Sequence, residues 1–276
     1  MNNAVAVRRW AHGLISAFVG DMDDRLKAVC CKPGSAKRVH QARRSMARLE
    51  AALADFAAIT AGRQKLQTRV HALRRRAGKV RDADVLCKRL KDYGAGAEVL
   101  RKSLRQRRKR GIRKFIEAAR KSPSRFKTGN PIAGARRVPL ADSMSVSDAN
   151  RNVVRVRFAE LLEASSALRS EDGDALHALR LAAKRLRYAL QRLGSERLQL
   201  FEADDALDDF AKALGAAHDS GVLARRAIEC GAADVAERSR RERLQQIESA
   251  RRLWRDLTRD SGPIAALGAY ARFHSV

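Results

Sequence analysis

The sequence contains few of the residues that build small secreted or zinc-stabilised domains. Only four of its 276 residues are cysteines, and none of them has the CxxC spacing of a zinc site. So few thiols in a chain of this length do not fit a disulfide framework, and we therefore expect reduced thiols and a cytoplasmic location. The N-terminal segment lacks the continuous apolar core of a secretory signal, and no stretch is long and apolar enough to cross a bilayer.

Strand patterns are also scarce. No segment alternates apolar and polar residues, β-branched residues are sparse, and the chain holds only five prolines. Leucine and alanine dominate the apolar residues, which is typical of helical bundles. We therefore predict an all-α fold with four helical segments in each half. The predicted organisation is a single domain over residues 1–276, with a first helical repeat at 1–122, a linker or crossover loop at 123–146, a second helical repeat at 147–260 and a C-terminal tail at 261–276.

Turn and cap signals divide these repeats into helices. Ser35 follows a Pro-Gly pair and is a candidate N-cap for the second helix. A break is expected near Gly20 and a turn over residues 215–221. Asp82 and Asp219 each follow an expected glycine-containing turn and precede an apolar run, so helix capping explains them better than acid–base catalysis or metal binding.

Acidic residues are missing from two helical segments that resemble each other. Residues 36–49 and residues 176–195 contain neither Asp nor Glu. Helical spacing places the apolar residues of each segment on one face and its basic residues on the opposite face. An ordinary exposed helix mixes the two signs, because like charges at this spacing repel. The acid-free faces therefore predict binding of a polyanion, as does the formal net charge of +27.

The basic side chains of these two segments are the first candidate binding residues. Arginine can donate two parallel hydrogen bonds to a phosphate, and a protonated histidine can donate from both ring nitrogens. The first segment provides His40, Arg43, Arg44 and Arg48, and the second provides His177, Arg180, Lys184, Arg185, Arg187 and Tyr188.

An internal duplication relates the two segments. His40 and His177 stand 137 residues apart, and residues 73–86 match residues 210–223 at the same offset without a gap. Two blocks in one register favour a duplicated unit over chance similarity. Three positions depart from the repeat: Ala47 stands where the second copy has Lys184, Glu50 stands where it has Arg187, and His218 stands where the first copy has Arg81.

Basic residues also dominate the two helices that follow the first segment. Residues 63–81 contain no acid, and nine basic residues crowd into positions 101–114. The second run covers most of a helix circumference, so its composition does not decide whether it joins the same surface. The sequence contains no P-loop, dinucleotide-binding glycine loop, HExxH motif or nucleophile elbow, and we expect no catalysis, no metal site and no cofactor.

These blocks resemble the CHAD family, the conserved histidine α-helical domain. The resemblance rests on VHQARRSMARLEAALADF, RVHALRRRAGKVRDADVL and LHALRLAAKRLRYAL and extends over nearly the whole chain. It implies two four-helix bundles related by a pseudo-twofold axis, with a basic cavity or groove that binds inorganic polyphosphate, and often association with polyphosphate granules. It adds Arg74, Arg75 and Arg81 to the binding residues. No ExExK motif of the triphosphate tunnel enzymes that often accompany this family occurs here, so the chain looks like a stand-alone member.

The expected function is therefore noncatalytic binding of inorganic polyphosphate. Nonspecific binding of nucleic acid is an alternative, because phosphate contacts dominate there too. The basic faces offer only Tyr188 for base stacking, which disfavours that alternative. An enzyme acting on polyphosphate and a scaffold that recruits a partner protein are further alternatives, and the oligomeric state stays open.

Overall fold

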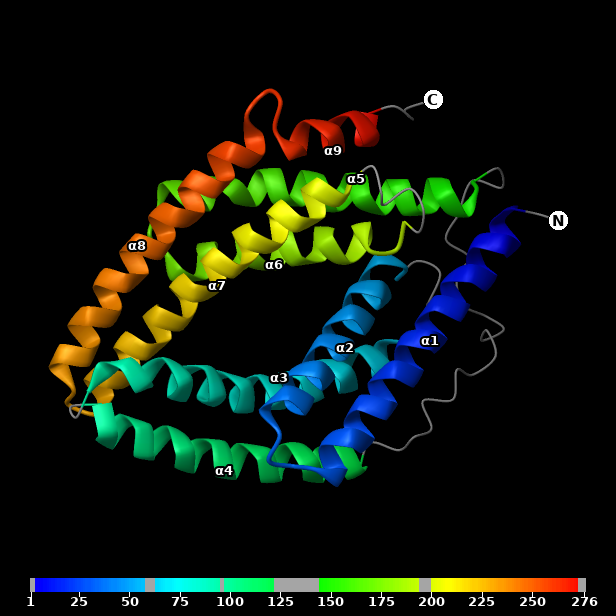
Figure 1. Ribbon diagram of the computed structural model, residues 1–276. Helices are drawn as coiled ribbons and strands as arrows, with labels where there is room; N and C mark the ends of the chain where they lie inside the picture. Colours follow the sequence, from blue (N-terminus) through cyan, green and yellow to red (C-terminus); the bar gives the residue numbers. More distant parts are fainter. Residues whose placement is uncertain (1–2, 58–62, 95–96, 122–143, 194–199, 273–276) are drawn as a thin grey trace. The chain divides into compact units, whose positions relative to one another are not determined.

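Each half of the chain forms its own compact helical unit in the computed structural model (Figure 1). The structure describes residues 3–57, 63–94, 97–121, 144–193 and 200–272. The first unit is Met1–Val146 and the second is Ser147–Val276. Within the described residues every regular element is helical and none is a strand, which confirms the all-α prediction.

The first unit contains four α-helices in its described part. They are α1 (Asn3–Cys31), α2 (Ala36–Asp55), α3 (Gln64–Arg89) and α4 (Glu98–Lys121), with a 3₁₀ turn at Leu90–Tyr93 between the last two. The predicted apolar stripe of α2 is buried from Val39 to Leu53 and joins side chains of α1, α3 and α4 in one core. Ser35 caps α2 as predicted, since its side-chain oxygen accepts a hydrogen bond from the Arg38 backbone N–H at 3.3 Å.

The second unit adds one helix to this arrangement. Its described elements are α5 (Val146–Ala164), a 3₁₀ turn at Ser165–Arg169, α6 (Gly173–Leu190), α7 (Phe201–Glu229), α8 (Ala233–Thr258) and α9 (Pro263–Arg272). The predicted stripe of α6 is buried from Leu176 to Leu190 in a core shared with α7 and α8. Asp172 caps α6 by accepting hydrogen bonds from two backbone N–H groups of the first turn.

Several predicted boundaries were wrong. α1 continues through Gly20, and α7 continues through Gly215 and Gly221, where we had expected a turn. Asp82 and Asp219 consequently lie inside α3 and α7 and cap neither helix. A glycine inside a helix costs only about 1 kcal/mol relative to alanine, and the apolar residues that α7 buries on both sides of Gly215 supply far more than that.

The ends of the second repeat also differ from the prediction. Residues 261–276 were expected to form a tail, but α9 occupies most of them, and its Leu267 is fully buried in the core of the second unit. Most of the predicted linker, residues 122–143, lies outside the described residues, and α5 begins at Val146. Gly231 lies in the turn between α7 and α8 and has a φ of 70°, which favours glycine.

Candidate functional site

In the second unit, the basic face of α6 lies along α7. Arg187 contacts Asp208, Arg180 contacts Gly215, and the ring of His177 lies 4.9 Å from the ring of His218. As the residue number rises on α6 it falls on α7, so the two helices run antiparallel. We call these six residues the α6–α7 row.

The first unit repeats two of these contacts at the same offset. Arg43 lies next to Gly78, with its Nε 3.7 Å from the place where a Cβ of Gly78 would be. Glu50 pairs with His71, whose Nδ1 is 3.3 Å from the carboxylate, and also with Arg74. We call these five residues the α2–α3 row. At the 137-residue offset, Arg43 and Gly78 correspond to Arg180 and Gly215. At the same offset, Glu50 and His71 correspond to Arg187 and Asp208.

Arg180 lies tightly against Gly215 in the α6–α7 row. A Cβ on Gly215 would lie 3.1 Å from Nε and 3.3 Å from Nη2 of Arg180. The Nε atom is buried and makes no hydrogen bond to any residue that the structure describes. No acid of the described chain pairs with this guanidinium, so its positive charge is not neutralised. Charge-assisted donors of this kind bind a phosphate oxygen strongly.

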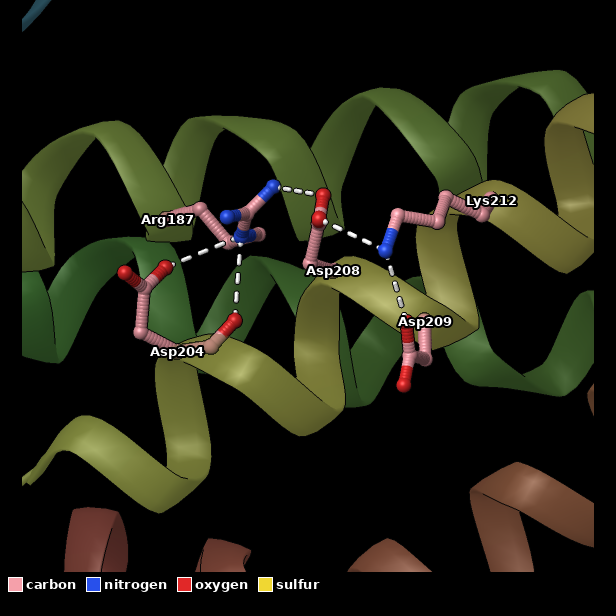
Figure 2. A network of polar contacts seen from close by, with 5 residues as sticks. All are labelled: Arg187, Asp204, Asp208, Asp209 and Lys212. Carbon is pink, nitrogen blue, oxygen red and sulfur yellow. Dashed lines mark hydrogen bonds and ion pairs between the residues drawn. The ribbon is translucent and has the colours of Figure 1, made fainter.

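Arg187 differs from Arg180, because acids of α7 surround it (Figure 2). Its Nε donates to the Asp204 carboxylate at 2.9 Å and to the Asp204 carbonyl at 3.1 Å, and Nη1 pairs with Asp208. Lys212 extends the network, with Nζ 3.1 Å from Asp208 and 2.8 Å from Asp209. Only 4% of the Asp204 side chain is exposed. Arg187 therefore links α6 to α7, although the sequence placed it among the binding residues.

Glu50 is the only acid in the α2–α3 row. Burial raises the pKa of its carboxyl group, and the positive charges of Arg74 and His71 oppose that rise. Arg74 was also predicted to bind the ligand, and here it is paired with this carboxylate. Each row thus contains one arginine–glycine contact, and its acid contacts basic side chains of the neighbouring helix: Glu50 contacts His71 and Arg74, and Asp208 contacts Arg187.

The other predicted residues lie on the same helices; Arg43 and His177 belong to the two rows, and the rest lie outside them. Arg44, Arg75 and Arg185 are exposed, while the side chains of His40, Arg43, His177 and Lys184 are partly buried. Five of the predicted arginines pair with no acid among the described residues: Arg44, Arg48, Arg75, Arg81 and Arg185. The remaining predicted residue is Tyr188, which is partly buried on α6.

The basic run of α4 separates into paired and unpaired side chains. Arg101 and Arg105 contact Glu98, and Arg108 contacts Asp84 and the Gly34 carbonyl. A group of exposed cations on the same helix has no acidic partner within the described residues: Lys102, Lys109, Arg110, Arg113 and Lys114. The run therefore remains a strongly basic surface of the first unit.

The part of the chain that the structure describes contains no group of three or more His, Cys, Asp or Glu side chains placed to hold a metal ion. None of its helices is both long and apolar enough to cross a membrane.

Gly78 and Gly215 were not among the predicted site residues, and Gly215 was expected to lie in a turn. They occupy equivalent positions in the aligned blocks 73–86 and 210–223, and Arg43 and Arg180 share their 137-residue offset, which was the available signal. Asp204 and Asp208 were not predicted as partners of Arg187, because a sequence does not give the pairing of two helices.

Comparison with known proteins gave one family and one fold. The model of the CHAD domain matches residues 14–227. The crystal structure of the CHAD domain from the plant Ricinus communis is similar, with a TM-score of 0.65 and 20% sequence identity over 98% of this chain and 92% of that chain. At this identity the likeness concerns the fold. A search of curated proteins gave no match.

Proposed function

The chain belongs to the CHAD family, and on that premise we propose that it binds inorganic polyphosphate without catalysis. The family is associated with polyphosphate binding in general. The observation that supports this ligand for the present chain is the Arg180 guanidinium, which lies against α7 with a buried Nε that has no protein acceptor among the described residues. A phosphate oxygen is the acceptor that such a guanidinium binds best.

The distribution of unneutralised charge supports a long, flexible polyanion. Arg44, Arg48, Arg75 and Arg81 add cations on α2 and α3 without acidic partners in the described chain, and Arg185 adds one on α6. Polyphosphate carries charge along a chain without bases, so a surface of guanidinium groups is sufficient for its recognition. Nucleic acid would gain little from its bases here, because Tyr188 is the only aromatic side chain among the predicted binding residues.

The acids of the two rows support a binding protein over a metal-dependent enzyme. Glu50 is paired with Arg74 and His71, and Asp204 and Asp208 are paired with Arg187. Carboxylates that neutralise cations in this way are poor ligands for Mg²⁺, which phosphoryl transfer requires. We therefore expect no release of phosphate from polyphosphate in the presence of Mg²⁺ or Mn²⁺.

The repeated contacts support the proposal that the units arose by duplication. The arginine–glycine contact and the ion-pair contact occur in each unit at positions 137 residues apart. We further propose that the protein resides in the cytoplasm on polyphosphate granules. Colocalisation of a fluorescent fusion with stained granules, lost in cells without polyphosphate, tests the location.

A competition experiment tests the ligand. Labelled long-chain polyphosphate bound to the protein is displaced by unlabelled polyphosphate, single-stranded RNA or duplex DNA at matched phosphate concentration and salt. We expect polyphosphate to compete best per phosphate. Equal displacement by RNA would instead support nonspecific binding of nucleic acid.

A pair of triple variants tests the site. The site triple replaces Arg44, Arg81 and Arg180 by Ala, and each lost charge-assisted hydrogen bond costs about 1.5–3 kcal/mol, so affinity should fall more than roughly 100-fold. The control triple replaces Lys109, Arg110 and Arg113 of α4, which removes the same charge. We expect it to weaken binding only about threefold, through the long-range field. Equal losses would mean that a diffuse field binds the ligand.

A further inference from the structure

Gly215 lies in the middle of the 29-residue helix α7, where the backbone geometry does not require a glycine. Only Gly94 and Gly231 have a positive φ within the described residues, so Gly215 has the ordinary conformation of a helix. Glycine there lowers the stability of the helix relative to alanine. An explanation must therefore come from what lies where a side chain would be.

The space beside Gly215 is filled by Arg180. A Cβ at this position would lie 3.1 Å from Nε, 3.3 Å from Nη2 and 3.5 Å from Cζ of the guanidinium. The two nitrogen distances are tighter than ordinary van der Waals contact, so an alanine would push the guanidinium away. The atoms that must move belong to the end of a flexible side chain. Helix α7 itself would not have to shift.

The equivalent contact in the first unit is looser. A Cβ at Gly78 would meet only Nε of Arg43, at an ordinary contact distance of 3.7 Å. The two arginine–glycine contacts therefore share their position and differ in how closely the guanidinium lies on the helix.

We propose that Gly215 is a positioning residue for Arg180, holding its guanidinium against α7 in the orientation that binds phosphate. The inference rests on the proposed polyphosphate-binding function. A side chain held in one orientation before binding loses less conformational entropy when the ligand arrives. Glycine at 215 thus increases affinity without itself contacting the ligand, and Gly78 makes a smaller contribution of the same kind.

The binding experiment uses the full-length variants Gly215→Ala, Arg180→Ala, the double variant and Gly20→Ala. Gly20 lies inside α1 with no atom within 4 Å of its Cβ position, so it controls for the helix propensity of alanine. We expect polyphosphate affinity to fall about fivefold in Gly215→Ala and about tenfold in Arg180→Ala. The double variant should bind no more weakly than Arg180→Ala, because Gly215 acts through that side chain. The thermal midpoint of Gly215→Ala should not fall.

A second measurement examines the contact without polyphosphate. Phenylglyoxal modifies accessible arginines, and peptide mass spectrometry gives the rate at Arg180. We expect this rate to rise in Gly215→Ala and to stay unchanged in Gly20→Ala.

Three results separate the inference from the function it rests on. Equal rates at Arg180 in the wild type and Gly215→Ala would overturn the positioning role, as would a binding loss that adds in full to that of Arg180→Ala. A wild type that does not bind polyphosphate would refute the proposed function, and the modification rates would still decide the arginine–glycine contact.

Discussion

Replacement of Arg187 by Ala should destabilise the second unit more than any other single removal of a basic residue from α6. The guanidinium is the partner of two carboxylates of α7, and only 19% of its side chain is exposed. Its removal leaves Asp204, which is 4% exposed, without this partner. A carboxylate that is buried without its counter-charge is one of the few causes of a large loss from one substitution.

The size of the loss follows from the burial of the two acids. Breaking a fully buried pair costs about 3–5 kcal/mol, while an exposed pair contributes about 1 kcal/mol or less. The energy of the contact with Asp204 should be close to that of a fully buried pair. The energy of the contact with Asp208, which is 29% exposed, should lie between those of a buried and an exposed pair. We expect a decrease in the free energy of unfolding of about 2–4 kcal/mol, or roughly 6–12 °C in the thermal midpoint.

Urea denaturation followed by circular dichroism at 222 nm measures this loss. Arg185→Ala is the matched control, because it removes the same charge only two residues from Arg187. The Arg185 side chain is exposed and has no acidic partner in the described chain. Its stability should change by no more than about 0.5 kcal/mol. Equal stability of the two variants would refute the view that Arg187 links α6 to α7. At a temperature where both are folded, Arg187→Ala should lose less polyphosphate affinity than Arg180→Ala.

Three further predictions concern affinity, stability and pH. The logarithm of polyphosphate affinity should fall linearly with the logarithm of salt concentration, and the site triple should reduce the slope by about two, which a titration at four salt concentrations measures. Ser35→Ala should lower the free energy of unfolding by about 1 kcal/mol in urea denaturation, because the cap of α2 is lost. Burial, followed by the charge of Arg63, lowers the pKa of His12, whose Nδ1 accepts a hydrogen bond from the Arg63 guanidinium at 2.7 Å. As the pH falls, His12 is therefore protonated in the unfolded chain before it is protonated in the folded chain, so the free energy of unfolding should decrease below about pH 6.5. In urea denaturation over pH 5–8, His12→Gln should reduce this pH dependence.

Much of the local structure could be predicted from the sequence, because helical periodicity depends only on neighbouring residues. The apolar stripes of α2 and α6 and the Ser35 cap all follow from spacing within one segment. The glycines of α7 were misread for the same reason. A glycine lowers local helix propensity, and nothing in its neighbourhood along the chain reveals that an arginine from another helix fills the space beside it.

Glu50 is a second case in which the sequence does not reveal contacts between helices. In the alignment of the repeats an acid at the position equivalent to Arg187 looks like a loss of equivalence between the two units. The contacts give it another meaning, because Glu50 pairs with His71 while Arg187 pairs with Asp208, which is His71's counterpart at the 137-residue offset. An ion pair between two helices needs one acidic and one basic side chain, and either helix can provide the acid. Between the two units the acid and the basic residue exchange helices, and each unit has a contact between them at this position.

The placement of acids on α7 suggests how a chain with a net charge of +27 keeps both a stable helix pair and an unneutralised arginine. Five of its seven acids lie among its first nine residues. Glu202 and Asp204 are in the first turn, where the helix dipole favours acids, and Asp204 and Asp208 reach Arg187. Residues 210–218, which surround Gly215, contain no acid. The ion-pair contact and the arginine–glycine contact lie seven residues apart on each helix, which is about 10 Å. Over two turns the ion pair can offset the repulsion between cations and hold α6 against α7, while the guanidinium of Arg180 has no acidic partner among the described residues.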